Sequence, residues 1–293
     1  MSRLAARIRT GLSLAAGAAL LLWLHPRFEA GVLSLVVVTA LAGLSIWELD
    51  HMGSFRGRKL GWMLSFACAA QVLGLGYLVL ARIGLDPRVG LIALYGASAL
   101  LAWPYLGWGF LASFLGRSLD VQDGRERLPK AGEVVPLSIW LFPPLFSIVL
   151  VDHAFGTVGL VVLVLLAKIG DNAGFFVGRA LGKTHPFPNV SPGKTVAGCV
   201  ASLVAGILAG GIVLPLTLGQ RTLPGAALGA FLGGLINVAA QAGDLSESWV
   251  KRQAGVKDSS PLLGPSGGVL DVIDSLLLAA PVALVAWVFA YGA

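Results

Sequence analysis

The fold of this chain is decided by the stretch from Gly243 to Asp274, GDLSESWVKRQAGVKDSSPLLGPSGGVLDVID. It holds five acidic and three basic side chains within 32 residues, although only 12% of the 293-residue chain is charged. The sequence on both sides is almost wholly apolar, with LPGAALGAFLGGLINVAAQA at 223–242 before it and a second apolar run to residue 290 after it. Because a charge beside hydrocarbon costs several kcal/mol unless it is paired or bound to a metal, this cluster predicts a functional site at a membrane surface.

The overall composition excludes a soluble globular domain. Hydrophobic residues make up 56% of the chain and the mean hydropathy is +0.83, whereas folded soluble domains stay near half apolar. Apolar windows close to the ~20 residues that a transmembrane helix needs recur at 10–24, 31–47, 61–81, 89–115, 134–151, 157–177, 196–218, 223–242 and 269–290. We therefore expect an all-α polytopic integral membrane protein with about nine transmembrane helices.

The distribution of basic residues sets the expected orientation, because cytoplasmic loops of membrane proteins carry an excess of lysine and arginine. With nine spans and the N-terminus inside, 16 of the 21 such residues fall in inner segments and four in outer segments, while Lys168 lies within a span. We therefore expect the N-terminus in the cytoplasm and the C-terminus outside. The net charge of +6 then belongs mainly to one membrane face. The sequence contains neither a soluble basic domain nor an aromatic-rich basic patch, so nothing in it indicates nucleic-acid binding.

The chain divides into two parts of one integral unit. Residues 1–133 hold the first four predicted spans, and their polar residues are largely confined to loops, whereas residues 134–293 hold spans five to nine. From Lys168 onward, ionisable residues reach into the span ends. Because charges at membrane depth are costly and usually functional, we expect the second part to carry the activity.

Two pairs of carboxylates stand at the ends of neighbouring predicted spans. Asp244 and Glu247 close the eighth span, and Asp271 and Asp274 open the ninth. Each pair has the i,i+3 spacing that puts both side chains on one helix face. Mg²⁺ prefers such hard oxygen ligands and shares them with substrate phosphates, so we predict a magnesium site made by Asp244, Asp271 and Asp274. Capping of a helix N-terminus is the alternative for Asp271, but it does not account for Asp244.

Basic residues and glycines that suit a phosphate lie close to these carboxylates. Lys194 and Thr195 stand in the string SPGKT, which lacks the first glycine of a Walker motif and follows no strand; at the start of a span they are suited to meet a phosphate directly. Topology alone also explains lysines in such loops, and only their combination with four carboxylates favours a site. Gly264, Gly267 and Gly268 predict a tight turn whose backbone N–H groups are open to a phosphate.

Taken together, the polar islands resemble the signature of the CDP-diacylglycerol synthases, also called phosphatidate cytidylyltransferases. The resemblance runs from about Lys168 to Asp274. Its matches are Asp171, FxGR at 176–179, GK at 182–183, SPxKT at 191–195, GDL at 243–245, SxVKR at 248–252, KDS at 257–259 and GGVxDxxD at 267–274. Glu48, at the end of the second predicted span, also resembles a family feature.

The resemblance implies transfer of CMP from CTP to phosphatidic acid, giving CDP-diacylglycerol and pyrophosphate, with Mg²⁺ as cofactor. For catalysis it implies Asp244, Asp271, Lys251, Arg252 and Asp274, with the three aspartates also as metal ligands. For substrate binding it implies Asp171, Lys183, Ser191, Lys194, Thr195, Lys257, Asp258, Gly267 and Gly268. It implies an integral protein of a bacterial inner (plasma) membrane with the active site facing the cytoplasm. The glycine-rich composition is compatible with a homodimer.

Three positions depart from the family pattern. Ser266 stands where the family has histidine, Val272 where it has arginine, and Ala197 where it usually has glutamate. Loss of these groups would weaken transition-state stabilisation, so the alternative is a divergent relative that acts on another lipid phosphate or is catalytically inactive. A phospholipid transporter is a weaker alternative, because most charges lie at one face and no inverted repeat is visible.

Lys168 lies one helical turn before Asp171 and far from the end of its span. Since it is too deep to reach water, it should pair with a carboxylate. One interpretation is a plain ion pair with Asp171. The other is that Lys168 supplies the positive charge of the arginine that is absent at Val272.

Overall fold

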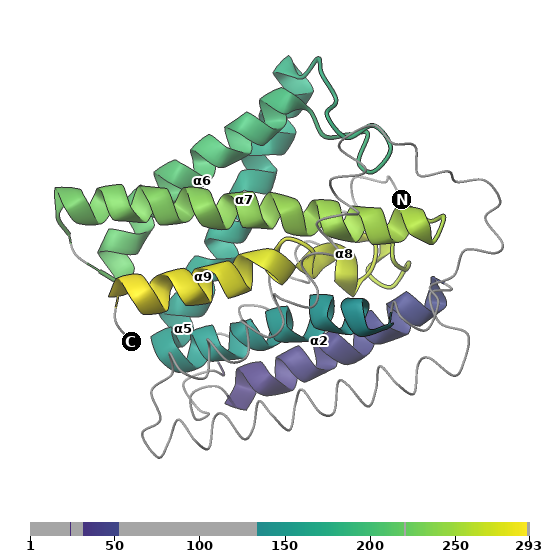
Figure 1. The fold of residues 1–293 in the computed structure, drawn as a ribbon, viewed down its shortest axis with the longest axis horizontal. Coiled ribbons are helices and arrows are strands. Elements are labelled where there is room, and N and C mark those ends of the chain that lie inside the picture. Colours follow the sequence, from purple (N-terminus) through teal and green to yellow (C-terminus); the bar gives the residue numbers. More distant parts are fainter. Residues whose placement is uncertain (1–23, 25–31, 53–133, 220, 292–293) are drawn as a thin grey trace.

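The computed structural model describes residues 24, 32–52, 134–219 and 221–291 (Figure 1). Its elements, in chain order, are α2 (Val32–His51), α5 (Val134–Leu181), α6 (Val196–Thr217), α7 (Leu223–Gln253), the 3₁₀ helix η3 (Gly264–Ser266), α8 (Val269–Ile273) and α9 (Leu276–Tyr291). The described residues form helices and no strand, which confirms the predicted all-α class.

Five segments of the described chain are long and apolar enough to cross a membrane. They are α2, Trp140–Leu181 of α5, α6, α7 and Val269–Tyr291. All of them coincide with predicted windows, and the windows at 10–24, 61–81 and 89–115 lie outside the described residues, except for residue 24. The helices are those of an integral membrane protein, while the nine-span count and the orientation stay predictions.

Helix α5 combines two of the predicted spans, 134–151 and 157–177, which meet at a sharp break. Gly156 has φ 63° and ψ −164°, values outside the helical region, and glycine adopts such a positive φ at little cost. In Figure 1 the half before Gly156 lies beside α2, and the half after it climbs behind α7 towards α6. The break therefore lets one segment contact opposite parts of the bundle.

Helix α7 continues past the predicted span end at residue 242 and stops only at Gln253. Beyond residue 242 it is rich in charge, and Glu247 and Lys251 pair across one turn, an i,i+4 arrangement that supports a helix. A hydropathy window ends where the charges begin, so it does not show that the charged segment is helical. The candidate site residues of this segment therefore lie on a rigid helix and not in a loop.

Close glycine contacts hold the helices around the site. Helices α6 and α7 cross where Gly210 faces Gly229 and Gly233, and a methyl group on Gly210 would collide with the backbone of both. Helices α5 and α6 meet similarly, because a Cβ on Gly174 would lie 3.0 Å from the carbonyl oxygen of Gly198. Backbones that approach this closely bring the polar ends of α5, α6 and α7 together.

Candidate functional site

Three carboxylates from two helices converge in the charged part of the molecule. Asp244 and Glu247 lie one turn apart on α7, and Asp274 is the C-cap of α8. One oxygen from each of the three lies within 4.8 Å of the other two. Glu247 is fully buried, and its Oε1 has no hydrogen-bond partner among the described residues. A carboxylate oxygen at this point is therefore available to a cation.

The two carboxylates of α7 each pair with a lysine. Lys194 Nζ, just before α6, lies 2.7 Å from Asp244 Oδ2. Lys251 Nζ, on α7 itself, lies 2.7 Å from Glu247 Oε2. From the sequence, membrane topology alone could explain the presence of each lysine. The structure places both of them in ion pairs with carboxylates of the two predicted pairs.

Lys168 of α5 joins the same group from another side. Its Nζ lies 3.1 Å from Asp274 Oδ1 and 3.7 Å from Asp171 Oδ2. The predicted pair with Asp171 is therefore present, but the shorter contact is with a carboxylate 106 residues away in the chain. The charged cluster is defined here as Lys168, Lys194 and Lys251 with Asp171, Asp244, Glu247, Asp271 and Asp274.

Asp271 has a different environment from the other predicted metal ligands. Its Oδ2 accepts hydrogen bonds from the N–H groups of Gly268 at 2.7 Å and Ser259 at 2.8 Å, and from the Ser259 hydroxyl at 2.6 Å. Its Oδ1 accepts one from Lys251 Nζ at 2.5 Å. Asp271 thus caps the N-terminus of α8, the alternative considered from the sequence. It is not among the three converging carboxylates, and its role as a metal ligand stays a prediction.

The turn before α8 has the form that its glycines predict. Gly264 and Gly267 have φ of 59° and 80°, a region that other residues rarely adopt. The N–H of Gly267 donates to Gly264 O at 3.1 Å, and the N–H of Gly268 donates to Asp271. Both groups therefore hold the turn in this arrangement, and their predicted contact with a phosphate is untested.

Glu48 of α2 is the residue whose importance the sequence shows least. It is fully buried, and its carboxylate accepts three hydrogen bonds. One comes from the hydroxyl of Ser260 at 2.7 Å, and two come from the N–H groups of Val269 and Leu270 at 2.7 and 2.8 Å. The hydroxyl oxygen of Ser259, whose proton is donated to Asp271, lies 2.9 Å from Glu48 Oε2. Glu48 therefore fastens α2 to the start of α8. The feature of the sequence that could have indicated this role is an acidic residue at the end of an apolar span.

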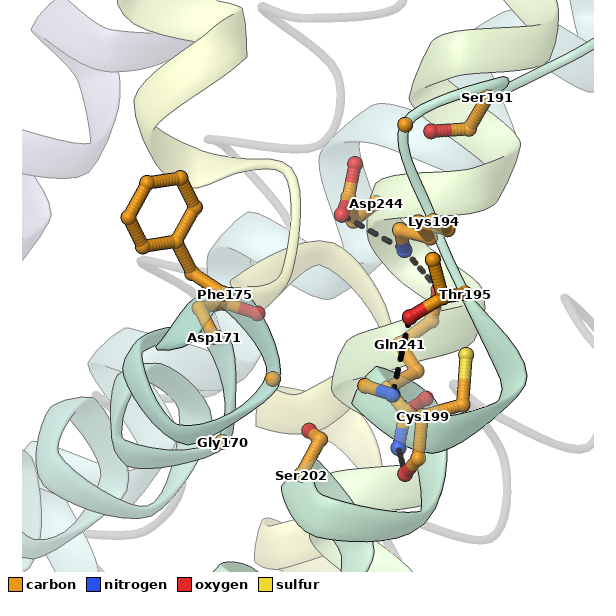
Figure 2. Close-up of a pocket in the computed structure, with 13 residues that line it drawn as sticks. Gly170, Asp171, Phe175, Ser191, Lys194, Thr195, Cys199, Ser202, Gln241 and Asp244 are labelled. Carbon is orange, nitrogen blue, oxygen red and sulfur yellow. Dashed lines mark hydrogen bonds and ion pairs between the residues drawn. The ribbon is translucent and has the colours of Figure 1, made fainter. Parts of the chain in front are cut away.

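A cavity of about 270 Å³ lies beside the charged cluster, among α5, the start of α6 and α7 (Figure 2). Its wall consists of Gly170, Asp171, Gly174, Phe175, Ser191, Gly193, Lys194, Thr195, Gly198, Cys199, Ser202, Gln241 and Asp244. Figure 2 shows Asp171 and Phe175 on one side, with Lys194 and Thr195 across from them. The predicted site residues that the cavity brings together are Asp171, Ser191, Lys194, Thr195 and Asp244.

Other predicted residues are not part of this cavity wall. The exposed ones are Lys183, Lys257 and Asp258. Arg252 donates from Nε to the Val190 carbonyl at 3.2 Å and from Nη1 to the Val256 carbonyl at 2.7 Å. Its guanidinium therefore ties the end of α7 to the segment before α6, and its predicted catalytic role is untested.

The fold and the site define a class of protein, an all-α membrane protein whose helices gather carboxylates and lysines beside one cavity. Residues 5–290 match the model of the cytidylyltransferase family, and the chain belongs to this family. The phosphatidate cytidylyltransferase of Mycobacterium bovis is 32% identical to it over 237 residues, which are 73% of this chain and 72% of the relative. These matches confirm the resemblance found in the motifs.

Two further relatives align with a shorter region of the chain. The phosphatidate cytidylyltransferase of Brucella suis biovar 1 is 41% identical over 129 residues, 44% of this chain and 46% of the relative. The one from Helicobacter pylori is 40% identical over 136 residues, 46% of this chain and 49% of the relative. In these alignments the chain spans about half the length of each relative.

Proposed function

We propose that this protein is a phosphatidate cytidylyltransferase, which transfers CMP from CTP to phosphatidic acid and releases pyrophosphate. The observation that carries the proposal is a cavity wall that combines Lys194 with Asp244, next to two further carboxylates. Such a site suits a polyphosphate, because ammonium groups meet phosphate oxygens while carboxylates hold a metal shared with them. Membership of the cytidylyltransferase family and the names of the relatives support this choice of substrates.

The proposed reaction asks little covalent chemistry of the protein. A phosphate oxygen of phosphatidic acid forms a bond to the α-phosphorus of CTP. The bond from that phosphorus to the oxygen bridging to the β-phosphate breaks, and pyrophosphate leaves with the electron pair. Because the nucleophile is already an anion, the protein has to align two anions and offset their repulsion. Lys194 at the cavity wall is placed to do so.

The converging carboxylates fit a magnesium ion. Asp244, Glu247 and Asp274 offer hard oxygen ligands, and the buried Oε1 of Glu247 has no donor to satisfy it among the described residues. We therefore assign the three as the residues that would hold the ion, with Glu247 in the place that the sequence gives to Asp271. Magnesium bound there would neutralise negative charge on the phosphates.

The proposal includes entry of the lipid from the bilayer and of CTP from the cytoplasm. Phe175 lines the cavity and is 59% exposed, and Phe176 beside it is 68% exposed, as suits side chains that face acyl chains. The proposed setting is a bacterial inner membrane, with nine spans, the N-terminus in the cytoplasm and the C-terminus outside. A homodimer belongs to the same proposal.

The test is pyrophosphate release by the purified full chain in lipid-containing micelles, with CTP, phosphatidic acid and Mg²⁺. Asp244→Asn removes one ligand charge, and Thr217→Val, an exposed residue at the far end of α6, is its control. We expect release that needs both substrates, persists in Thr217→Val and falls at least about a hundredfold in Asp244→Asn. Release without phosphatidic acid, or full release in Asp244→Asn, would contradict the proposal. CTP binding without release would overturn the choice of acceptor.

A further inference from the structure

We propose that Lys168 is a built-in counter-cation of the carboxylate site, which holds Asp274 until a divalent ion takes that carboxylate over. It then sets the affinity of the site for the ion, because the two cations compete for one carboxylate. The inference rests on the metal site of the proposed function and adds to it a residue to which no catalytic or substrate-binding role is assigned.

The geometry gives Lys168 two partners between which it can move. Its Nζ lies 3.1 Å from Asp274 Oδ1 and 3.7 Å from Asp171 Oδ2. Asp274 is one of the three converging carboxylates, whereas Asp171 is not among them. A small rotation of the lysine side chain therefore releases Asp274 and still leaves the ammonium beside a carboxylate. Because Asp171 lines the cavity, the same movement carries positive charge towards the cavity.

The other two lysines of the charged cluster are held more firmly. Lys251 Nζ lies between Glu247 and Asp271, at 2.7 and 2.5 Å. Lys194 Nζ lies 2.7 Å from Asp244 and also donates to the Gln241 carbonyl at 3.4 Å. Lys168 differs from both in that its two ion-pair distances are longer, at 3.1 and 3.7 Å, and in that its second carboxylate partner, Asp171, lines the cavity.

Charge balance points the same way. With all eight side chains ionised, the five carboxylates and three lysines of the charged cluster carry two negative charges in excess, the amount that one divalent cation neutralises. Removal of Lys168 raises the excess to three and removes the cation nearest to Asp274. Both effects favour metal binding, since the attraction between a divalent cation and the site grows with the charge of the site.

The experiment is titration of the purified full chain in detergent micelles with Mn²⁺, followed by the electron paramagnetic resonance signal of the free ion, without nucleotide or lipid. In Lys168→Met we expect a Kd about tenfold lower than in the wild type. Lys168→Arg keeps the charge and should stay close to the wild type. Arg179→Met removes one exposed positive charge from the same helix and is the control for net charge.

A second variant tests the two-partner geometry even if Lys168→Met does not fold. Asp171→Asn removes the second partner, so Lys168 should hold Asp274 more tightly and the Kd for Mn²⁺ should rise. A Kd that is unchanged or lower in Asp171→Asn, or unchanged or higher in Lys168→Met, overturns the inference and leaves the proposed function standing. Absence of Mn²⁺ binding by the wild-type protein overturns the metal site itself, and the inference with it.

Discussion

Glu247 and Asp271 contact the same ammonium group, Lys251 Nζ, at 2.7 and 2.5 Å, yet their surroundings differ. Asp271 accepts three more hydrogen bonds, from Ser259 and Gly268. Glu247 is fully buried and accepts no other among the described residues. An acid surrounded by donors organises the backbone around it, whereas an acid with an oxygen left over is ready to bind a cation.

Glu247→Gln and Asp271→Asn should therefore fail in different ways. Glu247→Gln should lower Mg²⁺-dependent turnover by about 10- to 100-fold with little loss of stability, because Lys251 keeps Asp271 as its partner. Asp271→Asn should lower turnover and also cost about 1–3 kcal/mol of stability, since donors around it lose a charged acceptor. Pyrophosphate release and thermal unfolding in the same micelles measure both effects. Equal destabilisation by the two substitutions would show that Glu247 is structural as well.

At the scale of elements, one side chain accepts the hydrogen bonds that join α2 to the short helix α8. Glu48 accepts hydrogen bonds from the first two N–H groups of α8 and from the Ser260 hydroxyl before it. A helix of five residues has little stability of its own. The carboxylate from α2 therefore adds to the apolar packing of α8 and helps to hold the helix, and with it Asp271 and Asp274, in place.

Glu48→Gln should disturb this contact although it changes the side-chain shape very little. Each carboxylate oxygen of Glu48 accepts a hydrogen bond from one backbone N–H group. In glutamine one of these oxygens becomes an NH₂ group, which cannot accept a hydrogen bond from the N–H group opposite it. We expect a loss of about 1–3 kcal/mol, seen as a lower midpoint of thermal unfolding. Thr39→Val, an exposed change on the same helix, should leave the midpoint near that of the wild type. Equal midpoints for the two variants would mean that the buried carboxylate does not stabilise α8.

The break in α5 gives a second prediction at this scale, with a matched control in α2. A Cβ added at Gly156 or at Gly43 would meet no atom within 4 Å, and the two positions differ in that Gly156 has a φ of +63°. Gly156→Ala should therefore destabilise the protein by about 1–2 kcal/mol through backbone strain alone. Gly43→Ala should be neutral or stabilise by up to about 1 kcal/mol, because alanine favours a helix. Thermal unfolding decides, and stabilisation by Gly156→Ala would contradict the observed break.

At the scale of the whole molecule, the hydropathy pattern accounts for the helices, and the polar islands account for part of the site. Apolar windows predict α2, both halves of α5, α6 and α9, because a helix is the way in which a single segment satisfies its backbone in lipid. The motifs select Asp244, Asp274 and Lys194, which do lie close together. Hydropathy windows do not predict the charged end of α7 after residue 242, because they detect only apolar segments.

What the sequence could not show are contacts that depend on how distant helices approach. Nothing in local spacing pairs Lys168 with Asp274 or Glu48 with the start of α8, since these partners are 106 and more than 200 residues apart. The i,i+3 rule treats Glu247 and Asp271 alike as members of carboxylate pairs. Only the tertiary arrangement puts Glu247 among the converging carboxylates, whereas the cap that Asp271 forms on α8 is a local interaction that the sequence already offered as an alternative.

The long separation between Lys168 and Asp274 also has a consequence for biogenesis. Synthesis runs from the N-terminus, so α5 reaches the insertion machinery well before α8 exists. In that interval the ammonium group of Lys168 has its ion-pair partner Asp171, one turn away on the same helix, but not yet the closer carboxylate of Asp274. A nascent chain that stops before α8 therefore holds Lys168 with only one of its two ion-pair partners, so this part of α5 reaches its final charge balance only after the last helices have been made.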